Sequence, residues 1–265
     1  MFFQFRHPAR KLLMRKLIIL AALFSPLALA DAISVAAHSV LRLPNKSSVV
    51  HLQRLDVADS ATLLLPASLV DLKVDELHLG QEARIAIVPA ETTLQIEVSR
   101  ASLGEGSQIV AHGAPGTYEK AAKAGRNLEL QLHELQASTL AIDARGGAGA
   151  PGYVGLDGAN GKPGGCTWGQ ASRGANGDNG GNGHDGAPGG RVRLALPAGF
   201  PAERIVVQLE GGAPGVAGAA GKPGAGGASK GCLVYSTAGG AAGKPGAAGQ
   251  PGSVGAAGEL ILQRL

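Results

Sequence analysis

The chain has 265 residues, of which 42 are glycine and only nine are aromatic. This glycine content is about twice ordinary usage. Four of the nine aromatic residues lie in the first 30 positions, which excludes an aromatic-anchored core and argues against a catalytic domain with a deep apolar pocket.

The N-terminal segment 1–30 has the pattern of a secretory signal peptide. It contains five basic residues and no acidic residue, and an almost entirely apolar run at 17–29 follows them. Ala28-Leu29-Ala30 ends the run as an A-x-A cleavage site would. The run is too short for the ~20 residues of a spanning helix, and Pro26 interrupts it, so cleavage is favoured over anchoring. The true start is either Met1 or Met14.

Loss of this segment changes the charge balance. Residues 31–265 carry 19 basic and 20 acidic residues, a net charge of −1 compared with +4 for the whole chain. We therefore expect no nucleic-acid partner. No later segment has the length and apolarity of a transmembrane segment, so none is expected after signal cleavage. The sequence predicts an exported protein of the periplasm, the cell surface or the extracellular space.

Residues 31–145 form a β-rich region with short apolar runs at regular intervals. The runs are 22, 24 and 31 residues apart when their central residues are taken as equivalent. These central residues are Leu63, Ile85, Ile109 and Leu140. Alternating segments such as 94–98 and 128–132 lie between them. The repeat predicts a mainly β fold, a short β-solenoid in which each rung stacks on the last. A β-sandwich is the alternative, because short strands alone do not distinguish the two.

The β pattern resumes beyond this region. Segment 191–210 reads as a further β rung, and 259–265 reads as a terminal strand. Three insertions leave the repeat at Gly113, Gly146 and Gly212, each shortly after an apolar run. Insertions at one corner of successive rungs stack on one side of a solenoid, so we expect these segments to lie together.

Glycine is concentrated in two blocks, 146–190 and 211–258, which hold 18 and 17 of the 42 glycines. Each block consists of two tracts with glycine at every third position, and the break between the tracts contains one cysteine. We call the blocks hairpin 1 (146–190) and hairpin 2 (211–258). The shared plan is an internal duplication.

The Gly-X-Y tracts resemble those of bacterial collagen-like exported proteins, a resemblance that implies a trimeric triple helix. The tracts are short, however, and all seven of their prolines occupy the third position, whereas collagens place much of their proline second. The tracts also resemble the polyglycine-II bundles of some antifreeze proteins, phage fibre adhesins and the N-terminal domain of a ribosome-associated GTPase family. We favour the bundle.

The bundle follows from the geometry of an extended left-handed helix with three residues per turn, in which Gly-X-Y makes one edge entirely of glycine. Such edges let backbones approach closely enough for N–H···O and Cα–H···O contacts. Two antiparallel hairpins would form a four-helix slab, with glycine inside and proline, which lacks an N–H, outside. A 19-residue tract would be about 55–60 Å long. A disordered Gly/Pro/Ala linker is the other reading, against which the strict period argues.

The two cysteines, Cys166 and Cys232, occupy matching positions in the two hairpins. In an exported chain this arrangement predicts a disulfide. Trp168 and Tyr235 lie close to them and are candidate tip contacts for a cell-surface glycan or protein. The alternative is that both aromatic side chains pack on the disulfide and cover it.

No P-loop, H-E-x-x-H or G-x-S-x-G motif occurs, so we expect no enzymatic activity and no cofactor. Segment 180–185 matches the start of a calcium-binding nonapeptide, but only once, and we expect no metal site. The sequence predicts a non-enzymatic structural or adhesive protein. A glycan- or ice-binding module and a trimeric collagen-like protein are the alternatives, and the oligomeric state is left open.

Overall fold

The structure is a computed structural model that describes residues 32–45, 47–167 and 169–265. The expected signal peptide and Trp168 therefore lie outside the described residues. Residues Ala32–Leu265 form one compact unit.

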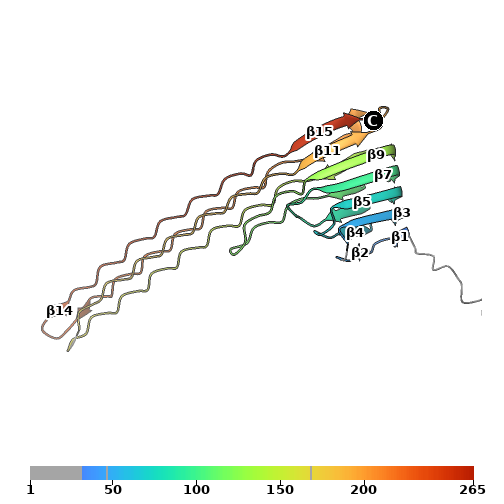
Figure 1. Cartoon of the computed structure of the whole chain (residues 1–265). Coiled ribbons are helices and arrows are strands. Elements are labelled where there is room, and N and C mark those ends of the chain that lie inside the picture. The colour runs from blue at the N-terminus through green and yellow to red at the C-terminus, as the bar shows by residue number, and fades with distance from the viewer. Residues whose placement is uncertain (1–31, 46, 168) are drawn as a thin grey trace, which may run out of the picture. The chain divides into compact units, whose positions relative to one another are not determined.

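All but two of the strands of this unit belong to two all-parallel sheets (Figure 1). Sheet A has seven strands in the order β1 (Ala32–Val35), β3 (Val49–Val57), β5 (Asp71–Leu79), β7 (Leu94–Leu103), β9 (Leu128–Ala137), β11 (Arg191–Leu196) and β15 (Glu259–Arg264). Sheet B has six, ordered from β2 (Val40–Arg42) through β4 (Thr62–Leu65), β6 (Arg84–Ile87), β8 (Gln108–Val110) and β10 (Leu140–Asp143) to β12 (Ile205–Gln208).

The chain alternates between the two sheets, so each rung gives one strand to each sheet, as in a β-solenoid. This parallel pairing differs from the antiparallel sheets expected of most β-sandwiches. A single 3-10 turn, Ala202–Arg204, is the only helical element among the described residues.

Apolar side chains from the two sheets stack in columns between them. Leu63 pairs with Ile85, Ile85 with Ile109, and Ile109 with Ile142, and all four side chains are almost fully buried. The last step is therefore 33 residues, and our choice of Leu140 as the fourth equivalent residue was wrong. Leu140 and Ile142 point to the same side of the strand, because side chains alternate with a period of two. Only the hydrogen-bond register shows which of the two residues is equivalent to Ile109.

The turn from sheet A to sheet B also repeats in the first four rungs. Its central residue has a positive φ at His38 (55°), Ser60 (54°), Glu82 (54°) and Gly106 (72°). The backbone N–H groups of the first three donate to carbonyls of the following rung at 2.8–3.1 Å. These bonds offset the cost of a left-handed conformation at non-glycine residues.

A buried arginine stabilises the opposite corner of the rungs, where the chain passes from sheet B back to sheet A. The Arg126 side chain is fully buried, and its Nε donates to the Thr92 carbonyl at 3.1 Å. Burial lowers the pKa of this guanidinium, since water no longer solvates the charge. Its guanidinium bonds reach loops of two earlier rungs, with backbone acceptors at Pro66, Ala67, Leu69, Val88 and Thr92.

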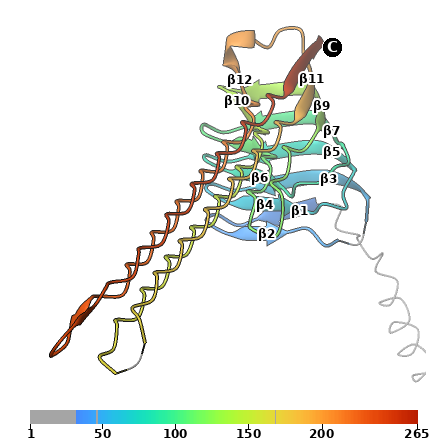
Figure 2. The ribbon, with the colours of Figure 1, turned by 90° about the vertical axis from the view of Figure 1, so that its left-hand side faces the viewer.

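The three insertions leave from this corner, each after a strand of sheet B. A short insert (113–125) follows β8, hairpin 1 follows β10, and hairpin 2 follows β12. Figures 1 and 2 show the two long hairpins running side by side away from the sheets. The prediction that the insertions stack on one side is confirmed by the backbone hydrogen bonds between them.

These hydrogen bonds arrange the long hairpins in two layers of extended chain. The outgoing tract of hairpin 1 (146–164) donates every third N–H to the outgoing tract of hairpin 2 (211–228) at 2.7–3.3 Å. The return tract 172–190 donates in the same way to the return tract 239–258 at 2.8–3.0 Å. Antiparallel bonds at 2.7–3.0 Å join the outgoing and return layers. We call this arrangement the slab.

Glycine is required where tracts meet. A Cβ on Gly218 would lie 1.9 Å from the Tyr153 carbonyl oxygen, and one on Gly152 would lie 2.0 Å from the Gly181 oxygen. At each point where the outgoing tract of hairpin 2 comes this close to a backbone carbonyl of hairpin 1, the residue of hairpin 2 is a glycine. The opposite edge of hairpin 1 carries Tyr153 and Leu156, both largely exposed, because the short insert reaches only its base.

Asparagine and aspartate side chains supply further acceptors on the outer faces of the slab. In the return layer, four side-chain oxygens of hairpin 1 each accept a backbone N–H of hairpin 2 at 2.6–2.8 Å. These side chains are Asn176, Asn179, Asn182 and Asp185. Asp157 and Asn160 do the same in the outgoing layer. The polar third positions of hairpin 1 thus satisfy donors that would otherwise face solvent.

Candidate functional site: the disulfide-linked tip

A disulfide joins the distal turns of the two hairpins. Cys166 and Cys232 are bonded, with their Cα atoms 5.7 Å apart and a sequence separation of 66. This confirms the pairing predicted from the sequence. Because the parallel tracts are held in register, the two turns reach the same level, and the bond closes there.

The turn of hairpin 2 is a small antiparallel β-hairpin. Strands β13 (Lys230–Gly231) and β14 (Ser236–Thr237) pair, and the Cys232 N–H donates to the Tyr235 carbonyl at 2.7 Å. The two residues at its apex, Leu233 and Val234, are 103% and 89% exposed. An apolar pair is therefore presented to solvent on a backbone that the disulfide and the strand pairing constrain.

Tyr235 connects the two hairpins. Its hydroxyl donates to the Cys166 carbonyl, while half of the residue stays exposed. The residue is thus held against the disulfide loop and still presents area to solvent. The contact role predicted for Tyr235 and Trp168 stays a prediction, and Trp168 lies outside the described residues.

Sequence reasoning missed Leu233 and Val234 as surface features. The sequence contained a signal for them. The glycine period is interrupted at Cys232-Leu233-Val234-Tyr235, and the Gly-X-Y tracts do not need large apolar residues there. No hydrophobic core is available at the end of a projecting hairpin. Large apolar residues at a break in the repeat there are therefore expected to be exposed.

Charge is unevenly distributed along the slab. The distal segments 158–177 and 222–245 contain no acidic residue and five basic ones. These are Lys162, Arg173, Lys222, Lys230 and Lys244. The two segments lie at the same level, since Gly158 donates to Lys222 and Gly177 donates to Lys244. The tip is consequently a positively charged region around an apolar apex.

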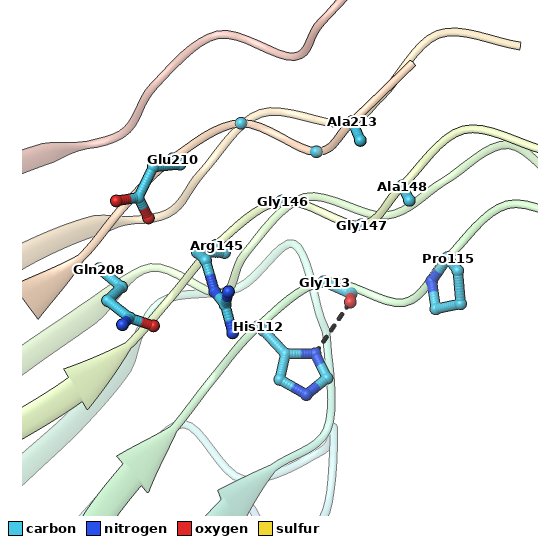
Figure 3. A pocket seen from close by; sticks show the side chains of 12 residues that line it. His112, Gly113, Pro115, Arg145, Gly146, Gly147, Ala148, Gln208, Glu210 and Ala213 are labelled. Atoms are coloured by element: carbon cyan, nitrogen blue, oxygen red, sulfur yellow. Dashed lines mark hydrogen bonds between the residues drawn. The ribbon is translucent and has the colours of Figure 1, made fainter. Parts of the chain in front are cut away.

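A second feature lies at the base of the slab. An open groove of about 480 Å³ is lined by residues that follow three successive strands of sheet B (Figure 3). His112 follows β8, Arg145 follows β10, and Gln208 and Glu210 end or follow β12. His112 Nδ1 lies 3.0 Å from the Gly113 carbonyl, which can only accept, so Nδ1 donates and Nε2 is the acceptor of the neutral ring.

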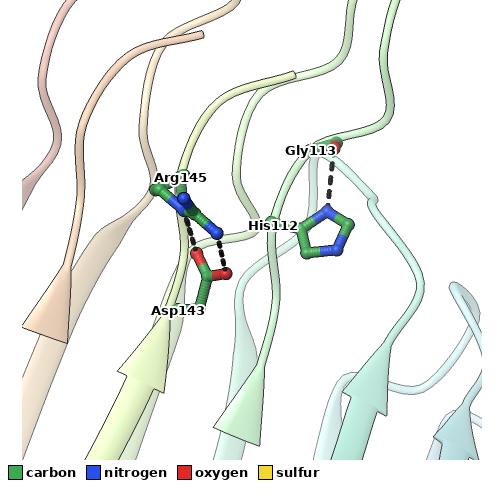
Figure 4. Close-up of polar contacts among 4 residues, drawn as sticks. All are labelled: His112, Gly113, Asp143 and Arg145. Carbon is green, nitrogen blue, oxygen red and sulfur yellow. Dashed lines mark hydrogen bonds and ion pairs between the residues drawn. The ribbon is translucent and has the colours of Figure 1, made fainter. Parts of the chain in front are cut away.

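Arg145 is fixed within this groove by Asp143 (Figure 4). Its Nε and Nη2 lie 3.0 and 2.8 Å from the two carboxylate oxygens, a bidentate pair. Partial burial by itself would raise the pKa of Asp143, but hydrogen bonds from the Arg145 side chain and backbone outweigh it and lower the pKa. The hydrogen bond and charge of Asp143 raise the pKa of Arg145, the charge of Glu210 adds to this effect, and the His112 Nε2 remains as an acceptor of the groove.

Carboxylates on the outer face of sheet A are engaged in ion pairs. Glu97 lies 2.9 Å from Lys73, whose hydrogen bond lowers the pKa of Glu97, and Glu76 lies 2.5 Å from Arg100. In the calcium-like segment 180–185, Asn182 accepts a backbone N–H, as does Asp185. The described ranges hold no group of three His, Cys, Asp or Glu residues that could bind a metal ion.

Comparisons with known proteins give no relative. No protein-family model, curated protein or solved structure matches the chain. Among the residues that the structure describes, no helix has the length and apolarity needed to cross a membrane.

Proposed function

We propose that the protein is an exported, non-enzymatic structural or adhesive protein, in which a β-solenoid carries a slab of polyglycine-II helices and the tip of the slab contacts a partner. The polyglycine-II assignment is supported by backbone hydrogen bonds that recur every third residue between neighbouring tracts. At about 3.1 Å per residue, the 19-residue outgoing tract of hairpin 1 holds the tip about 55–60 Å from the rungs.

The observation that carries the proposal is the near-complete exposure of Leu233 and Val234 at a constrained apex. Exposed apolar groups in a monomer are ordinary when scattered, but a pair on a fixed projecting turn marks an interaction site. The disulfide and the Tyr235–Cys166 hydrogen bond hold this turn before any partner arrives. Less conformational freedom is then lost on contact, which favours binding.

Export to an oxidising compartment is part of the same proposal. Segment 1–30 has the pattern of a signal peptide, and the disulfide forms and persists most readily in an oxidising compartment.

The test is complementation of adhesion. A strain lacking the gene receives either the wild-type chain or the Leu233→Ser, Val234→Ser double variant, and the attachment of cells to surfaces and to one another is measured. The variant should be displayed at the wild-type level and fail to restore attachment. A matched control replaces Val216 and Val254, each 68% exposed on the slab, and should restore it. Equal attachment with both variants would contradict a function at the tip.

Glycan binding is the second candidate function, and the basal groove favours it. Glu210, Gln208 and the His112 Nε2 are polar groups of both donor and acceptor type that line one open groove. A glycan array read with wild type and Glu210→Gln tests it. Ice binding by the small outward side chains of the slab is tested separately by measuring thermal hysteresis.

A trimeric collagen-like assembly is the remaining alternative. It would need the glycine N–H groups that now donate within the chain to donate between chains instead. Sedimentation with and without reductant distinguishes the two. The slab predicts a monomer in both, and a trimer unaffected by reductant would contradict it.

A further inference from the structure

The distal end of the slab differs in charge from the rest of the chain. Five of the 19 basic residues of segment 31–265, and none of its 20 acidic residues, lie within 158–177 and 222–245. Asp157 and Asp178 lie at the level of Lys222, and with them included the net charge of −1 divides into +3 at the distal end and −4 elsewhere. A field of one sign at one end of a long projection orients that end toward an anionic surface.

The apolar apex extends beyond these charges. Lys230 lies in β13, two residues before Cys232, and Leu233 and Val234 follow on the exposed turn. Lys162 precedes Cys166 by four residues in the other turn. Cations thus flank the apex on both hairpins.

We propose that the tip binds the surface of an anionic lipid bilayer, with Leu233 and Val234 entering the interface and the distal cations facing the headgroup phosphates. This rests on the proposed function, in which the tip makes the contact. A soluble polyanion would engage the cations but offer nothing to two fully exposed apolar side chains. A bilayer supplies an apolar phase and a negative surface together.

The expected strength is modest and has two separable parts. Each basic residue near an anionic membrane surface strengthens binding by about fivefold at low salt. Burial of one Leu or Val side chain strengthens it by about tenfold. Binding should accordingly weaken as added salt shortens the screening length from about 10 Å at 0.1 M to about 3 Å at 1 M.

The experiment is co-sedimentation with vesicles of phosphatidylcholine alone, or of phosphatidylcholine mixed with phosphatidylglycerol. The protein is purified from an exporting host, and its N-terminus is determined by mass spectrometry. We expect salt-sensitive binding to the anionic vesicles only.

Two variants separate the apolar and the charged contributions. Leu233→Ser with Val234→Ser should lose about a hundredfold in binding, and Val216→Ser with Val254→Ser should lose none. Lys162→Gln with Lys230→Gln should lose about fivefold per charge, and Lys120→Gln with Lys123→Gln in the short insert should lose little. Thiol labelling before and after reduction verifies that each variant keeps its disulfide.

Two results would overturn the lipid assignment. These are the absence of wild-type binding to anionic vesicles, and vesicle binding unaffected by the apex variant. Dextran sulfate, which offers no apolar phase, should bind wild type and apex variant equally. If the vesicles fail while the apex variant still abolishes cell attachment, the tip contacts a protein or glycan and the proposed function stands. If both fail, the proposed function is wrong as well.

Discussion

A methyl group at Gly218 should separate the two hairpins. In Gly218→Ala the new Cβ would lie 1.9 Å from the Tyr153 carbonyl oxygen, 2.8 Å from its carbonyl carbon and 2.9 Å from the Gly181 nitrogen. Optimal carbon–carbon separations are about 3.5–4.0 Å, so a backbone must move by about 1 Å or more. All these neighbours are backbone atoms, which cannot rotate away as a side chain would.

The expected cost follows from the bonds that meet at this point. Gly218 donates to the Gly181 carbonyl at 2.9 Å, Gly181 donates to Tyr153 at 2.8 Å, and Gly249 donates to Gly218 at 3.0 Å. Each such bond contributes about 0.5–1.5 kcal/mol net. Alanine recovers about 0.4–1 kcal/mol by restricting the unfolded chain, since Gly218 does not have a positive φ. We expect a net loss of about 2–4 kcal/mol in the free energy of unfolding.

The assay is denaturant unfolding combined with amide hydrogen exchange. Gly218→Ala should lower the unfolding midpoint and speed exchange in both outgoing tracts beyond this level. Ala219→Val, at the exposed neighbouring position, should change neither, and Gly231→Ala, whose Cβ would have no atom within 4 Å, should raise the midpoint slightly through the unfolded chain. If Gly218→Ala is as stable as the wild type or more stable, as backbone entropy alone would make it, the close packing of the tracts is refuted.

Three further predictions concern the disulfide, the buried arginine and the basal ion pair. Replacing both Cys166 and Cys232 by serine should lower the free energy of unfolding by about 4 kcal/mol, because the bond closes a long loop with a sequence separation of 66, yet leave a monomer in sedimentation. Arg126→Met should lower the free energy of unfolding by about 3–5 kcal/mol, because buried carbonyls lose their hydrogen-bond donor. Denaturant unfolding measures this, and an unchanged midpoint would contradict the role given to this side chain. The folded-state pKa of Asp143 is lowered, so its stabilising contribution is present above the unfolded pKa of about 3.9 and is lost as pH falls through the folded value. Unfolding measured from neutral to acidic pH should show a smaller acid loss in Asp143→Asn, and equal losses would refute this.

Much of the architecture was predictable because it repeats. Strand equivalences at Leu63, Ile85 and Ile109 follow from spacing, and the structure pairs these residues. The duplicated glycine plan likewise predicted the Cys166–Cys232 disulfide. A repeat lets one unit predict the position of the next, so the prediction needed no knowledge of contacts.

The candidate site was only partly predictable. Sequence placed Tyr235 near the disulfide but gave no sign that its hydroxyl bonds to Cys166. The break in the glycine period marks Leu233 and Val234, but only the fold shows that nothing covers them. The burial and hydrogen bonds of Arg126 could not be predicted from the sequence either, because its carbonyl acceptors lie up to 60 residues away.

The sequence by itself determined the period-three tracts, the approximate rungs and the pairing of the two cysteines, because each is a local pattern or a count. Only the tertiary structure decided the register that replaces Leu140 with Ile142, and which glycine column faces which neighbour. It also decided that the polar third positions of hairpin 1 bond to backbone groups of hairpin 2. These depend on hydrogen bonds between segments far apart in sequence, 33 residues for the pairing of β8 with β10 and 65–68 residues for the side-chain bonds, and the residues on either side of such a bond carry no local mark of it.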